Sequence, residues 1–148
     1  MKPLSKVNRN SGIDVLTDWL FSLPELSYVA SIDSIEAQDV SSDIQSKVEL
    51  ARCKLILNLD PKKFTNQELR NAQATISISE QMGAELAEIR RLNLEAEKTK
   101  AAKKYYDDEF RAVKDEVYYL HRNKELIDQK ELLRMKAKAL GDSSDNRD

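Results

Sequence analysis

The side chains with the clearest potential for chemistry are two tyrosine pairs, Tyr105–Tyr106 and Tyr118–Tyr119, set in a run of alternating charges. Aromatic rings beside lysines can stack bases, as in proteins that bind single-stranded nucleic acids. The same rings can instead line the seam where two helices meet. Tyr106 shares a helical stripe with Val113, whereas the other three rings fall on other faces. We therefore favour a protein-contact seam over a stacking platform.

Few residues point to catalysis or to a metal. His121 is the only histidine and Cys53 the only cysteine, too few for a His- or Cys-based metal site. Cys53 falls in an apolar helical stripe, which predicts a core residue and not a nucleophile. The paired acids Asp107 and Asp108 are of a kind common on helix surfaces, and no nucleotide-binding, zinc-protease or nucleophile-elbow motif is present. We expect no enzyme activity, no cofactor and no metal.

The composition indicates an all-α protein. Among 148 residues, 34% are charged, and glycine and proline occur only three times each. Sandwiches, barrels and sheet-based folds need many more turn residues than this. The net charge of −2 argues against strong sequence-independent binding to phosphates. No stretch is apolar enough to predict a membrane span, and a lone cysteine suits a reducing compartment, so we expect a soluble, cytoplasmic protein.

Residues 1–60 are predicted to form a head of two or three short helices. Ser11 is well placed to cap a first helix, which Pro24 should end. A further helix is expected to begin near Ser42 and to end before Pro61. The head is therefore small.

The remaining chain predicts a short linker at 61–64, a long helix over 65–140 and a flexible tail at 141–148. A T-x-x-E capping box opens the long helix, which contains no proline and only one glycine, Gly83. Residues 95–104 lack a large apolar side chain, but they also lack a turn signal, so we expect the helix to continue through them. At ~1.5 Å per residue, the helix would reach roughly 110 Å.

Apolar side chains along this helix recur at coiled-coil spacing and form the predicted seam. Its members are Ile78, Met82, Leu86, Ile89, Tyr106, Phe110, Val113, Val117, Leu120 and Ile127. The block up to Ile89 and the block from Tyr106 do not share one register when counted from Leu86. Because the seam is too long for the head to cover, we expect another molecule to cover it.

The sequence thus predicts a small N-terminal helical cluster followed by a long, coiled-coil-forming C-terminal helix. We expect a non-enzymatic scaffold or adaptor subunit that forms a homo-oligomer or binds a helical partner. One alternative is an oligomeric DNA- or RNA-binding accessory protein; another is a regulator or inhibitor that binds a larger enzyme through its helix. The nucleic-acid contacts would be Lys98, Lys100, Lys103, Lys104, Arg111 and Lys114.

Overall fold

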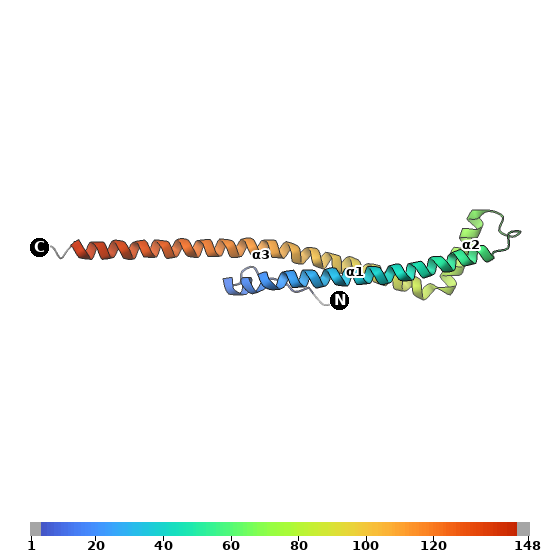
Figure 1. Ribbon diagram of the computed structural model, residues 1–148, viewed down its shortest axis with the longest axis horizontal. Helices are drawn as coiled ribbons and strands as arrows, with labels where there is room; N and C mark the ends of the chain where they lie inside the picture. Colours follow the sequence, from blue (N-terminus) through green and yellow to red (C-terminus); the bar gives the residue numbers. More distant parts are fainter. Residues whose placement is uncertain (1–3, 145–148) are drawn as a thin grey trace. The chain divides into compact units, whose positions relative to one another are not determined.

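The structure, a computed structural model, describes residues 4–144, with side chains described to residue 141. Residues 4–144 are 87% helical and form three helices: α1 (Ile13–Asn58), α2 (Gln67–Gln81) and α3 (Gly83–Ser144) (Figure 1). Residues 4–144 contain no strand. The prediction of an all-α fold with a long C-terminal helix is confirmed.

The helices build two compact units. Residues 26–105 form the first unit, which also takes in Leu4. Residues 5–25 and 106–144 form the second. Helices α1 and α3 therefore supply one segment to each unit, whereas α2 belongs to the first unit alone.

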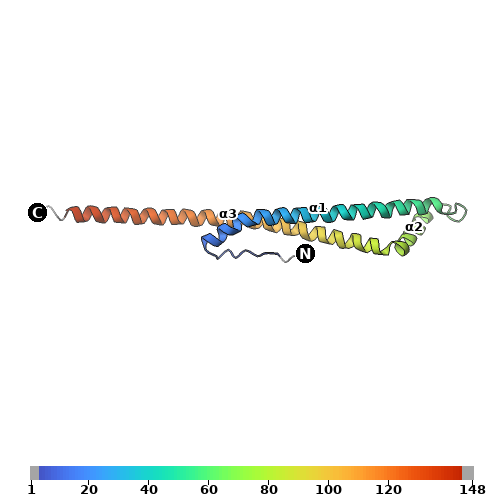
Figure 2. The same ribbon diagram turned by 60° about the horizontal axis from the view of Figure 1, so that its bottom comes forward.

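In the first unit, α1 and α3 lie side by side and run in opposite directions (Figures 1 and 2). Their buried residues are mostly small: Ser27, Ala30, Ser34, Ala37 and Ser41 of α1, and Leu92, Ala96, Thr99 and Ala102 of α3. The Ser34 hydroxyl donates a hydrogen bond to the backbone carbonyl of Ala96, with 3.2 Å between the two oxygens. A serine side chain reaches a neighbouring backbone only when two helices approach closely, which small residues permit. Ser41 adds a second link, at 2.7 Å between its Oγ and the Oδ1 of Asn93.

The second unit has larger core residues. Leu16 and Leu23 of α1 are buried together with Tyr106, Val113 and Val117 of α3. The segment before α1 also contacts α3. The Ser5 amide donates to the Tyr106 hydroxyl at 3.4 Å, and Arg9 pairs with Glu109 at 2.7 Å between Nη2 and Oε1.

Helix α1 differs from the short helices that the sequence predicted. It begins at Ile13 and ends before Pro61, as expected, but it continues through Pro24. The prediction that Pro24 ends a helix is therefore wrong. Proline removes one backbone hydrogen bond and crowds the preceding turn. Because the helix continues, Leu23 before Pro24 and Ser27 after it are both buried. This packing offsets the cost of a proline inside the helix.

The boundaries of α2 and α3 also need correction. Asn66, not Thr65, caps α2, and its Oδ1 accepts from the Leu69 amide at 2.8 Å. The predicted unbroken helix from residue 65 is wrong, because Met82 leaves the helical conformation (φ −126°, ψ 32°) and Gly83 begins α3. From there, α3 is continuous through residues 95–104, as predicted.

The C-terminal end of α3 lies beyond the predicted one. Gly141, the first residue of the predicted tail, is inside the helix, since α3 extends to Ser144. Of the tail predicted at 141–148, residues 145–148 lie outside the described part of the chain.

Candidate functional site

The structure separates the predicted seam into three groups. Ile78, Tyr106, Val113 and Val117 are buried. Met82, Leu86, Ile89, Phe110 and Leu120 are partly buried. Ile127 is exposed, with 57% of its surface accessible.

The chain itself buries part of the predicted seam. Val113 and Val117 lie in the second unit, whose core also holds Leu16 and Leu23 of α1. For Tyr106, Val113 and Val117, the expectation that another molecule covers them is wrong, because these residues of α3 are buried within the chain itself. The missed signal is a set of small residues. Ala96 and Thr99 lie between the two blocks of large apolar residues and are buried. They continue the three- and four-residue spacing from the first block to the second.

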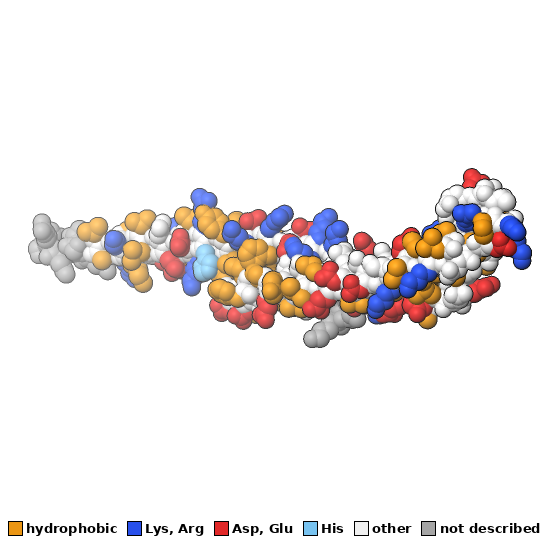
Figure 3. Space-filling view, turned by 45° about the vertical axis from the view of Figure 1, so that its right-hand side comes forward, with side chains coloured by type: hydrophobic (Ala, Val, Ile, Leu, Met, Phe, Trp, Pro, Cys, Tyr) orange, Lys and Arg blue, Asp and Glu red, His pale blue; other side chains and the backbone are white. Residues whose placement is uncertain are grey.

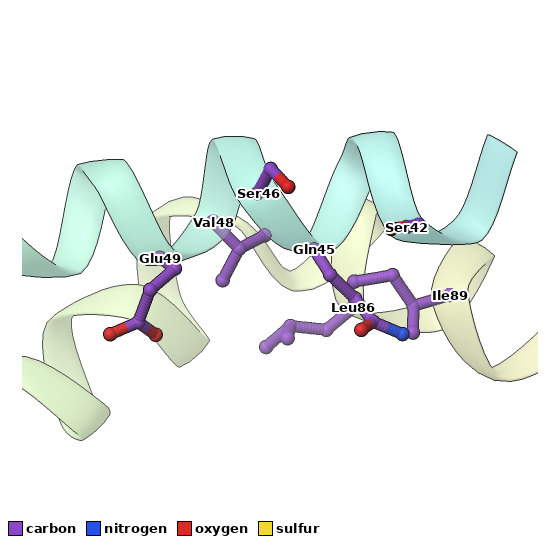
Figure 4. A pocket seen from close by; sticks show the side chains of 7 residues that line it. All are labelled: Ser42, Gln45, Ser46, Val48, Glu49, Leu86 and Ile89. Atoms are coloured by element: carbon purple, nitrogen blue, oxygen red, sulfur yellow. The ribbon is translucent and has the colours of Figure 1, made fainter. Parts of the chain in front are cut away.

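A shallow groove lies between α1 and α3 in the first unit, with a volume of about 500 Å³. Figure 4 shows Gln45 and Val48 of α1 beside Leu86 and Ile89 of α3, two residues of the predicted seam. Gln45 donates to the Ser41 hydroxyl at 3.2 Å, so its amide is already engaged. The groove lining contains one ionisable side chain, Glu49, and no acid–base pair.

The predicted nucleic-acid contacts are divided between the two units. Lys98, Lys100, Lys103 and Lys104 belong to the first, and Arg111 and Lys114 to the second. Acidic residues are interspersed with them. Arg111 Nη1 lies 3.9 Å from Asp108 Oδ1, and on the face drawn in Figure 3 basic and acidic side chains alternate.

Cys53 and His121, the only cysteine and histidine, do not form a catalytic or metal-binding group. Cys53 is exposed, so its prediction as a core residue is wrong. It lies on the outer side of α1 with Leu50 and Leu57, which are exposed as well. His121 is exposed. Within the described chain, no three His, Cys, Asp or Glu side chains are grouped as metal ligands.

One local charge cluster lies on the exposed surface of α3. Arg91 Nη2 contacts Glu88 Oε1 at 2.7 Å, and its Nη1 contacts Glu95 Oε2 at 2.9 Å. The hydrogen bond from Arg91 lowers the pKa of the Glu88 carboxyl, and the same bond raises the pKa of Arg91. Both groups are solvent-exposed, so this cluster is a surface feature of the helix.

The most distinctive exposed surface is the C-terminal part of α3. Every side chain from Lys124 to Gly141 is exposed. Leu126, Leu133 and Leu140 are spaced by seven residues, so they lie on nearly the same side of the helix. We call these three leucines the C-terminal row. Sequence reasoning missed the row because it followed the stripe of Val113 to Ile127, which is on a different side.

The C-terminal row has only basic or uncharged neighbours on the helix surface. Positions three and four residues from Leu126 and Leu133 share their side of the helix. These positions are Arg122, Asn123, Gln129, Lys130, Lys136 and Ala137. The nearby acids Glu125, Asp128 and Glu131 are instead one or two residues from a leucine of the row, and such positions do not face each other. The row is thus apolar with a positive border.

Two further apolar side chains of this segment lie off the row. Leu132 and Met135 are exposed, one and two residues from Leu133, so they are about 100° and 160° around the helix from it. The apolar residues are therefore divided between two sides and form no single broad apolar face. A narrow stripe with a seven-residue repeat is the pattern of a coiled-coil contact.

Comparison of the chain with protein-family models, with curated proteins and with solved structures finds no match. Among the described residues, no helix has both the length and the apolar character that spanning a membrane requires.

Proposed function

We propose that this protein is a non-enzymatic, cytoplasmic scaffold subunit that self-assembles through the C-terminal row of α3. The observation that carries the proposal is the exposure of leucines at seven-residue spacing on one helix. Leu126 is 47% exposed and Leu133 is 65% exposed. Exposed leucines in a regular row are typical of a helix that packs against another helix.

The state of the helix around the row supports the same proposal. A helix in a globular protein gains most of its stability from packing one apolar side against a neighbour. The core residues of α3 end at Val117, and every side chain beyond Asn123 that the structure describes is exposed. The segment with the row is helical without such packing in one chain. Association with a second helix would supply it.

The residues that the chain buries take a different role in this proposal. Tyr106, Val113 and Val117 hold α3 to its own chain and are not the contact with another molecule. Assembly therefore belongs to the part of α3 beyond them. This assignment keeps the expectation of coiled-coil assembly but moves its site toward the C-terminus.

Light scattering of the full chain over a concentration series up to about 100 μM tests the proposal. We expect a mass above that of one chain, which falls toward one chain on dilution. A single-chain mass throughout the series would refute self-assembly. A polynucleotide titration on the same material tests the alternative of a DNA- or RNA-binding protein. That alternative requires polynucleotide binding that weakens steeply as the salt concentration rises.

A further inference from the structure

Helix α1 carries an exposed apolar surface in the first unit. Tyr28 is 67% exposed and Ile35 is 50% exposed, and Ile32 lies between them, three residues from Ile35 and four from Tyr28. The buried serines and alanines of α1 occupy other positions of the helix, against α3. This apolar surface is thus a second side of α1.

The border of this surface is acidic. Glu36 is four residues from Ile32 and Asp39 is four residues from Ile35, so both share its side of the helix. Both acids are exposed. Residues 26–46 contain no lysine or arginine. We call Tyr28, Ile32, Ile35, Glu36 and Asp39 the acidic strip.

We propose that the C-terminal row of one copy docks on the acidic strip of a second copy. This inference rests on the proposed self-assembly and names its two surfaces. Each surface is an apolar stripe of helical spacing, and their borders carry opposite charges. The chain leaves both exposed, so a second copy can match them. Docking would place the row as a third helix beside the α1–α3 pair.

Pairing of two identical rows is disfavoured by charge. Lys130 lies between Leu126 and Leu133 on the same side of the helix. Two rows face to face would bring basic borders together, and like charges in an interface oppose association. Glu36 and Asp39 of the strip supply the opposite charge. Because the row and the strip are different surfaces, the contact is heterologous and copies add head to tail.

A membrane surface fits the row less well than a helix does. Helices that lie on membranes have one broad apolar face. In this segment Leu132 and Met135 lie away from the row, so its apolar face is narrow. The seven-residue spacing of the leucines matches a helical partner instead.

Charge exchange between the two surfaces tests the inference. One variant reverses the border of the row with Lys130→Glu and Lys136→Glu. A second reverses the strip with Glu36→Lys and Asp39→Lys. All four positions are exposed, so both variants should fold, which circular dichroism verifies. Each variant alone should assemble at least about tenfold more weakly than the parent at low salt.

Recombining the reversed surfaces gives the decisive measurement. A single chain with all four substitutions should assemble as the parent does, because its surfaces are again opposite in charge. An equimolar mixture of the two variants should also assemble, with the two variants alternating, because each row then meets a strip of opposite charge on the other variant. Parent assembly should weaken as salt screens the borders.

The outcomes separate this inference from the proposed function. If the parent assembles but the strip-reversed variant assembles equally well, the strip is not the docking surface, although self-assembly stands. Failure of the fourfold variant to recover assembly would also overturn the inference. A parent that remains one chain would overturn both proposals, whether or not it binds vesicles of anionic phospholipid.

Discussion

Removing two leucines of the C-terminal row should dissociate the assembly without unfolding the chain. Leu126 and Leu133 are 47% and 65% exposed, so roughly half of each side chain remains for a partner to bury. Complete burial of a leucine contributes about 1.5–3 kcal/mol. Burial of the exposed half of both leucines would then contribute about 1.5–3 kcal/mol to the contact. The double variant Leu126→Ser/Leu133→Ser should therefore associate roughly 10- to 150-fold more weakly.

The matched control removes two exposed apolar side chains of the same segment that are not in the row. Leu132 and Met135 are 53% and 71% exposed. The variant Leu132→Ser/Met135→Ser also introduces two serines into the helix and so carries a similar cost in helix propensity. Its association should change by less than about threefold. Sedimentation over a dilution series measures both variants. Equal losses in the two variants, or no loss in either, would refute the assignment of the row.

The remaining predictions concern the fold. Leu23→Ala should lower the free energy of unfolding in urea by about 2–5 kcal/mol, because Leu23 is fully buried in the second unit. Pro24→Ala should raise it, by up to about 3 kcal/mol, since alanine restores the helix hydrogen bond; an unchanged urea midpoint would contradict this. Ala96→Leu should cost about 1–3 kcal/mol by forcing α1 and α3 apart where Ala96 is buried, and a neutral result would argue against their close approach. Arg91→Ala should raise the Glu88 pKa toward its ordinary value in an NMR titration. In the parent protein, the pairing of Glu88 with Arg91 contributes its full stabilisation at pH values above the ordinary carboxyl pKa. This contribution is lost as the pH falls through the lowered pKa of Glu88.

The sequence could predict the helices better than their ends. Pro24 shows why, since a proline has a local cost that packing elsewhere can offset, and α1 continues through it. Met82 shows the opposite case. No proline or turn sequence precedes Gly83, and yet the helix is interrupted at Met82, four residues after the buried Ile78 of α2. Local propensity is a weak guide wherever tertiary burial differs on the two sides of a residue.

The candidate site was predictable in kind but not in position. Coiled-coil spacing along α3 is visible in the sequence, and so is the seven-residue spacing of the C-terminal row, which includes Leu133. Spacing alone does not tell which stripe the chain covers itself. Val113 and Leu133 both have apolar partners at helical spacing, but only Val113 is buried by its own chain.

The sequence by itself determined the helical class, the scarcity of catalytic groups and the charge that borders each apolar stripe. These follow from composition and helical periodicity, which need no knowledge of neighbours. Only the tertiary structure decided which stripes are core and which are surface. The deciding factor is the close packing of α1 on α3 through serines and alanines such as Ser34 and Ala96, whose side chains are too small to mark a seam by hydrophobicity. Burial depends on what lies opposite a residue, and a single helix pattern does not contain that information.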